Sequence, residues 1–168
     1  MKRNFSAVVT VLALLASTGF AQTRPKESLR GISGVYLYVH PVGKEVEAGG
    51  LSTGQIDKAV RAQLREAGVP LDDQPQPADG SANFVVIIDT VKQPQGVYIF
   101  EVQVSLLQEV HLARRQQPDP FPAETWSAKA IGLTTPNRMD ILLAPLKEKA
   151  AEFIEDYRSV NPRLSLPK

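Results

Sequence analysis

The residues best suited to chemistry are two histidines and the carboxylates near one of them. His40 and His111 belong to different predicted strands, and Glu101 and Glu109 lie on the same strand as His111. Two imidazoles and one carboxylate would make a metal site if the fold brought them together. Their spacing along the chain does not by itself indicate such a site, because none of the local ligand patterns of known metal sites is present.

Other catalytic and cofactor-binding patterns are missing from the sequence. The chain has no cysteine, which removes thiol catalysis and the most common zinc sites. No serine stands in G-x-S-x-G, and the glycines match neither G-x-x-x-x-G-K-[ST] nor G-x-G-x-x-G. We therefore expect a non-enzymatic protein without a cofactor. The alternative is a small-molecule or metal-binding protein, or a hydrolase, with a site near His40 and His111.

A second group of residues predicts a contact surface. In "YIFEVQVSLLQEVHL", from Tyr98 to Leu112, the even positions are mostly apolar and the odd positions mostly polar. This alternation predicts a strand with one side in the core and one in water. Such a side can be merely the wet back of an antiparallel sheet, or it can bind a partner, since tyrosines beside charges are good contact residues. The candidate interaction surface comprises Tyr36, Tyr38, His40, Glu101, Gln103, Ser105, Glu109, His111, Ser127 and Lys129.

The elements that must position this surface follow in the order β-α-β-β-β-α. Short connections between the last three strands favour an antiparallel meander. The whole predicts a two-layer α+β domain, with an antiparallel sheet of about four strands and two helices on one face. The expected strands are 35–39, 84–91, 97–113 and 123–133, and the expected helices are 53–67 and a last helix from about 137 to the Asn161-Pro162 stop.

Three details stay open at this level. The strand 97–113 would span ~55 Å, so either a bulge near Leu107 and Gln108 bends it or a hairpin arm projects from the body. Pro145 either kinks the last helix or lies in its first turn. In 123–133, Trp126, Ala128 and Ala130 compete with Ile131 and Leu133 for the inner side.

The N-terminus has the features of an export signal. Lys2 and Arg3 precede the apolar run "FSAVVTVLALLASTGF", and small residues lead to a cleavage site after Ala21. The expected organisation is a signal peptide at 1–21, a flexible leader at 22–31, a single α+β domain at 32–162 and a tail at 163–168. An uncleaved membrane anchor is the rival interpretation of residues 1–21.

Composition restricts the partners. The full chain has 19 Lys and Arg against 18 Asp and Glu, and removal of the signal would leave one net negative charge. Without a basic surplus, nucleic acid is not an expected partner. Cleavage would leave a periplasmic or secreted chain with no stable membrane span. An envelope protein or a second copy of the chain is the expected kind of partner.

Several stretches resemble small exported bacterial proteins of an uncharacterised family. These are "LSTGQIDKAVRAQLREAGVPL", "VSLLQEVHLAR", "ETWSAKAIG" and "FIEDYRSVNP". More distantly, the element order is similar to α+β modules of envelope proteins, such as the N-terminal domain of the Tol translocation β-propeller protein and the lipopolysaccharide-assembly lipoprotein. The resemblance implies a role in protein contact within the cell envelope.

Overall fold

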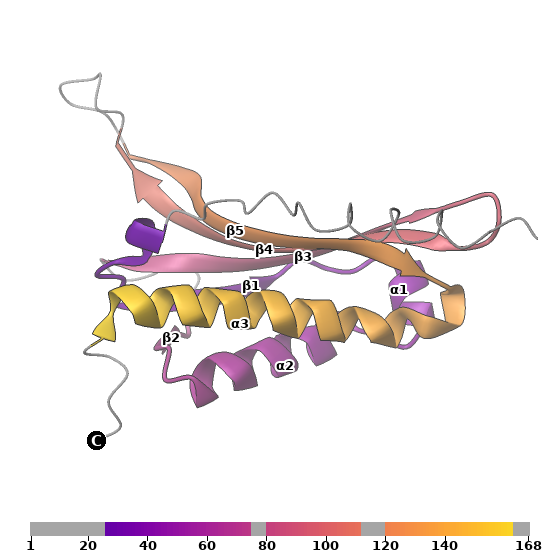
Figure 1. The fold of residues 1–168 in the computed structure, drawn as a ribbon, viewed down its shortest axis with the longest axis horizontal. Helices are drawn as coiled ribbons and strands as arrows, with labels where there is room; N and C mark the ends of the chain where they lie inside the picture. Colours follow the sequence, from indigo (N-terminus) through magenta and orange to yellow (C-terminus); the bar gives the residue numbers. More distant parts are fainter. Residues whose placement is uncertain (1–25, 75–79, 112–119, 163–168) are drawn as a thin grey trace, which may run out of the picture.

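The computed structural model describes residues 26–74, 80–111 and 120–162. They form one sheet with a layer of helices on one of its faces (Figure 1). The expected signal peptide and tail lie outside the described residues. The elements are η1 (Lys26–Leu29), β1 (Gly34–Val39), α1 (Lys44–Ala48), α2 (Thr53–Glu66), β2 (Leu71–Asp72), β3 (Ser81–Lys92), β4 (Tyr98–Val110), β5 (Phe121–Thr134), η2 (Pro136–Leu142) and α3 (Leu143–Val160).

The sheet is mixed, with the strand order β2-β1-β3-β4-β5. β3, β4 and β5 pair antiparallel, as predicted for the last three strands. β1 runs parallel to β3, so the expectation of an antiparallel sheet is wrong at this pair. The reason is the helical crossover through α2, which returns the chain to the end of the sheet where β1 began. A fifth, very short strand, β2, pairs parallel with β1 and was not expected.

The core lies between the sheet and the pair of long helices, α2 and α3 (Figure 1). Alternate residues of the strands point towards the helices and are buried, as the period-2 pattern predicts. Around Phe153 of α3, the rings of Phe84 and Trp126 pack edge to face, with centroid distances of 4.7 and 5.3 Å. The buried inner strand residues include Val35, Leu37, Ala82, Phe84, Val86, Val102, Val104, Leu106 and Trp126.

The first long helix, α2, begins and ends as its sequence predicts. The Ser52 hydroxyl accepts a hydrogen bond from the Gln55 N–H, and the Gln55 side chain accepts one from the Ser52 N–H at 2.8 Å, which completes a capping box. At the other end Gly68 has a φ of 75°. The next residue, Val69, donates its N–H to the Leu64 carbonyl at 3.0 Å and is buried.

Pro145 lies in the first turn of α3, which is one of the two arrangements that the sequence left open. The preceding residues form the 3-10 segment η2, and Arg138 within it has non-helical dihedral angles. A proline in the first turn removes no hydrogen bond from the helix, because the first N–H groups of a helix have no acceptor within the same helix. The helix therefore begins anew at Leu143 instead of running from residue 137.

A bulge bends the hairpin of β4 and β5. Leu106 pairs with Trp126 but Leu107 pairs with Glu124, so Thr125 is the extra residue on β5. The bulge thus lies at the predicted level of the hairpin, but on β5 and not within β4, where it was expected. The hairpin beyond it leaves the plane of the sheet (Figure 1). A bulged strand twists more strongly, and β4 follows this twist as the partner of β5. The twist allows two long strands to belong to a small sheet.

The described part of the expected flexible leader is packed on the domain. Leu29 of η1 is fully buried. The Lys26 ammonium lies 2.8 Å from a carboxylate oxygen of Asp156, and the other oxygen of Asp156 accepts a hydrogen bond from the Trp126 indole at 3.0 Å. This contact between η1, α3 and β5 joins distant parts of the chain. The sequence near Lys26 therefore does not indicate that this segment packs on the domain.

The connection between β1 and α2, for which the sequence analysis predicted no helix or strand, contains the short helix α1. Its Val46 is fully buried, and this single apolar anchor holds the helix on the core. Glu45 accepts a hydrogen bond from the Thr90 hydroxyl at 2.9 Å. Hydrogen bonding from the backbone of Glu45, and then from Thr90, holds the pKa of this carboxyl below its usual value.

Candidate interaction surface

The side of the sheet away from α2 and α3, here called the outer face, is built from residues of constant parity on each strand. The odd residues of β4 from Ile99 to Leu107 point to it, because the even ones are buried beneath the helices. On β3 their partners are Val91, Asp89, Ile87, Val85 and Asn83. No helix of the described residues lies over this face (Figure 1).

The structure brings most of the predicted surface residues together on the outer face. Tyr38 of β1 is opposite Val85, which is opposite Ser105, which is opposite Ser127 of β5. The next row of pairs joins Gln103 to Lys129. The predicted residues in this part of the face are Tyr36, Tyr38, His40, Glu101, Gln103, Ser105, Ser127 and Lys129.

Two of the predicted residues lie elsewhere, and one is not accessible. Glu109 and His111 are beyond the bulge, towards the end of β4, and both are exposed. Ser105 is on the outer face but only 3% exposed, in the middle of the sheet between Val85 and Ser127. The expectation that Ser105 offers a contact is therefore corrected, because a buried hydroxyl presents no surface.

The accessible polar side chains of the outer face pair across the strands. The Lys129 ammonium lies 3.2 Å from a Glu101 carboxylate oxygen, and the Gln103 amide donates a hydrogen bond to Glu124 at 2.9 Å. The rings of Tyr38 and His40 meet edge to face at a centroid distance of 6.3 Å. Exposed ion pairs contribute little to stability, typically ~0–1 kcal/mol, so these groups can exchange partners easily. We call Tyr36, Tyr38, His40, Glu101, Gln103 and Lys129 the polar region.

The outer face is not polar throughout, so the prediction of one apolar side and one polar side is too simple. Four aliphatic side chains at one end are 61%, 38%, 70% and 66% exposed, and we call them the aliphatic patch: Val91, Ile99, Ile131 and Leu133. The register places Ile99 between Val91 and Leu133 on neighbouring strands, so the patch is continuous. The sequence contained part of this signal, because Ile99 has the same parity as Glu101.

The pattern on β5 resolves the register that the sequence left open. Trp126 and Ala128 face the core, and Ile131 and Leu133 face outward. Gly132 lies on the inner side directly over the Phe100 ring, where a Cβ atom would come within 2.6 Å of Cζ. The absent side chain thus makes room for a core aromatic ring.

His40 and His111 do not share a site. The His40 N–H donates to the Val86 carbonyl at 2.9 Å, which places His40 beside Ile87 and Gln103. His111 is eight residues further along the chain than Gln103, a separation of about 26 Å in a strand. In the described ranges, His, Asp and Glu side chains form no group of three that could hold an ion. The geometry thus gives no support to a single metal or hydrolase site that uses both histidines.

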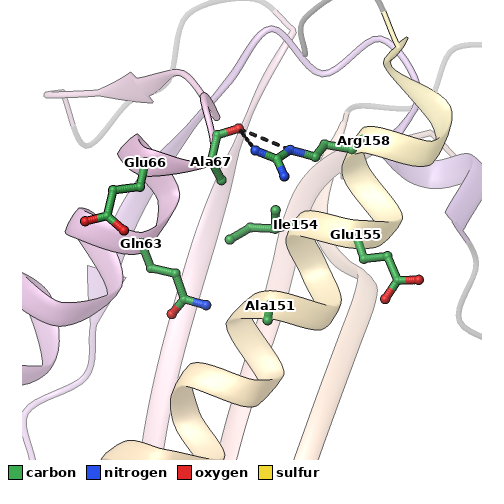
Figure 2. Close-up of a pocket in the computed structure, with 7 residues that line it drawn as sticks. All are labelled: Gln63, Glu66, Ala67, Ala151, Ile154, Glu155 and Arg158. Atoms are coloured by element: carbon green, nitrogen blue, oxygen red, sulfur yellow. Dashed lines mark hydrogen bonds between the residues drawn. The ribbon is translucent and has the colours of Figure 1, made fainter. Parts of the chain in front are cut away.

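A shallow groove of about 510 Å³ lies between α2 and α3 on the opposite side of the molecule (Figure 2). Its polar residues hold the two helices together. Arg158 donates two hydrogen bonds to the Ala67 carbonyl, at 3.2 and 2.6 Å, and Gln63 donates one to the Lys147 carbonyl at 2.9 Å. A cation on the last carbonyls of α2 also complements the helix dipole. We therefore assign these residues to the packing of the helix layer.

Comparison with known proteins adds one structural likeness. No protein-family model matches the chain, and no curated protein matches it. Among solved structures, the chain is similar to a minor lipoprotein from Acinetobacter baumannii, with 11% sequence identity and a TM-score of 0.32 over 79% of this chain and 95% of that one. A likeness at this level carries no argument about function.

None of the helices in the described part of the chain has the length and apolar content that a membrane span requires.

Proposed function

We propose that this protein is an exported, non-enzymatic binding module of the bacterial envelope, and that its outer face contacts a protein or another envelope component. The observation that carries the proposal is the outer face itself. All the long helices of the described residues lie on the other side of the sheet, so a wide surface of four strands is left open to a partner (Figure 1).

The chemistry of the outer face suits contact better than catalysis. Tyr38 is 45% exposed and meets the His40 ring edge to face. The exposed ion pair of Lys129 and Glu101 lies on the same face, on β5 and β4. Towards one end of the same face, the aliphatic patch offers apolar area that would be dehydrated on binding. Protein interfaces are enriched in aromatic side chains and combine apolar area with polar groups, and the outer face offers both kinds of group. The export signal that the sequence predicts at residues 1–21 supports a periplasmic or secreted location, where an envelope component would be within reach.

A binding experiment tests this assignment. The purified protein and a Tyr36→Ala/Tyr38→Ala/Glu101→Ala variant are each used to capture partners from envelope extract. A matched variant, Lys58→Ala/Arg65→Ala/Glu155→Ala, changes three exposed residues of the helix layer instead. We expect the first variant to lose a captured species that the second retains, with both variants showing the circular dichroism of the unchanged protein. Equal recovery of every species by all three proteins would refute the role of this surface.

A cross-linking experiment locates the contact more directly. A photoreactive phenylalanine analogue at Tyr38 should give an adduct in intact cells, whereas the same analogue at Lys58 on α2 should give none. Adducts from Lys58 alone would move the binding surface to the helix layer.

A further inference from the structure

The edge of the sheet at β5 is protected along only half of its length. β5 is the last strand in the sheet, so one of its sides has no strand partner among the described residues. Its N-terminal half contains Pro122 and the bulge at Thr125, and the Thr125 carbonyl accepts a hydrogen bond from the Ser28 hydroxyl of η1 at 2.9 Å. Prolines, bulges and covering segments are the usual devices that keep an edge strand from pairing with another chain.

The C-terminal half of β5, from Ser127 to Thr134, contains no proline or bulge, and no covering segment is seen on it in the part of the chain that the structure describes. A charged side chain, lysine above all, is a further device that protects an edge. This half of β5 contains one charged residue, Lys129, and that ammonium turns back over the sheet to Glu101 on β4. The two most exposed aliphatic side chains of the aliphatic patch, Ile131 and Leu133, lie on this same half. An unprotected strand edge thus coincides with exposed apolar area.

We propose that two copies of the chain associate through this half of β5. The strands pair antiparallel about a two-fold axis near Ile131, so the two sheets become one continuous sheet. Ile131 then faces the partner's Ile131, and Leu133 faces the partner's Lys129. All of these side chains stay on the outer face, because a residue pair in register keeps the same side of the sheet. The aliphatic patches of the two copies meet across the axis.

Charge and area both fit a second copy. The paired segment has a single charge per copy, and antiparallel pairing keeps the two Lys129 ammonium groups about four residues, or ~13 Å, apart along the strands. That separation exceeds the Debye length of ~10 Å at 0.1 M salt. The methylene stem of Lys129 can cover the partner's Leu133 while its ammonium stays with Glu101. A single strand pair flanked by the aliphatic patches is a small contact, and interfaces below about 1,200 Å² in total are typically weak, so we expect a reversible dimer.

This inference goes beyond the proposed function and does not depend on it, because it concerns purified protein without any other partner. Sedimentation velocity over a range of concentrations should show a monomer–dimer equilibrium. The Ile131→Lys/Leu133→Lys variant should be monomeric up to about 100 μM, and it should stay folded because both side chains are already exposed. A Tyr36→Ala/Tyr38→Ala variant, which keeps Glu101 as the partner of Lys129, should still dimerise, so the two proposals can fail separately.

Single cysteines locate the axis without background, because the natural chain contains none. Antiparallel strand pairs bring opposite Cα atoms within about 4.5–5.5 Å, which allows a disulfide. Oxidation should therefore cross-link Ile131→Cys at least ~10-fold faster than Val91→Cys, which lies two strands away from the axis in each copy. Lys129→Cys and Leu133→Cys should react more slowly than Ile131→Cys.

Four results would overturn the dimer proposal. These are a protein that stays monomeric at the highest concentration, a dimer that survives the Ile131→Lys/Leu133→Lys change, a cysteine series that does not peak between 129 and 133, and open-ended oligomers. Open-ended oligomers would indicate an unsymmetrical contact between copies. Association of this strand with a different protein in place of a second copy would also overturn the proposal.

Discussion

Substitution of Gly132 by alanine should destabilise the protein because of one contact with the Phe100 ring. The new Cβ atom would lie 2.6 Å from Cζ and 2.8 Å from Cε1 of Phe100, which is closer than carbon atoms approach. Phe100 is only 7% exposed beneath the helix layer, so its ring cannot move into solvent. The backbone of Gly132 does not have a positive φ, so an alanine is otherwise acceptable there.

Two effects of opposite sign decide the magnitude. Replacing glycine by alanine in an unstrained position stabilises a protein by about 0.4–1 kcal/mol through the unfolded state. Overpacking a closed core costs about 1–3 kcal/mol. The overlap with a buried ring favours the second effect, and we expect a net loss of about 1–2 kcal/mol in the free energy of unfolding. For a domain of this size that lowers Tm by roughly 3–8 °C.

A double-mutant cycle read by urea denaturation tests the reasoning. Phe100→Leu shortens the side chain below Gly132 and by itself should cost about 1–1.5 kcal/mol. In that background, Gly132→Ala should be neutral or stabilising, which gives a coupling energy of at least ~1 kcal/mol. Gly54→Ala is the control, because no atom lies within 4 Å of its Cβ position and alanine favours the helix. If Gly132→Ala cost the same in both backgrounds, the clash with Phe100 would not be the cause.

The remaining predictions concern a helix cap, a buried carboxylate and an acid group. Ser52→Ala should lower the free energy of unfolding by about 1 kcal/mol in urea denaturation, because it removes the capping box of α2. Asp156→Ala should cost about 2–3 kcal/mol by leaving the Trp126 indole N–H without this buried acceptor, and Asp156→Asn, which keeps an acceptor oxygen, should cost less. NMR titration should find the pKa of Glu45 below its usual value and raised again in Thr90→Ala. Since that pKa is lower in the folded state, its contribution to stability should be complete above pH 4.5 and should be lost as the pH falls through the folded value.

Local signals in the sequence were sufficient for the elements that depend on near neighbours. The capping box and the glycine stop specify α2 within two residues at each end, since every partner of Ser52 and Gly68 lies within one helical turn. The alternation of apolar and polar residues in β4 likewise predicts which of its side chains are buried. These patterns depend on residues close together in the chain, so the sequence alone is sufficient to predict the elements that they specify.

The remaining features depend on contacts between distant residues. The parallel pairing of β1 with β3 is decided by the path of the crossover, and α1 is held by a single buried side chain, Val46. The side of β5 that faces the core is decided by the hydrogen bond of Trp126 with Asp156 and by the room that Gly132 leaves for the Phe100 ring. The aliphatic patch is divided among three strands, so it becomes a surface only once the register is known.

The beginning and the end of the domain are joined by hydrogen bonds at Asn161. Its side-chain oxygen accepts from the Gly31 N–H at 2.8 Å, and its amide donates to the Leu29 carbonyl at 2.8 Å. During synthesis, which begins at the N-terminus, η1 therefore cannot make these two hydrogen bonds until the last turn of α3 has been made. The domain is therefore complete only when nearly the whole chain has been made, and truncation just before Asn161 should loosen the docking of η1 at the other end of the sequence.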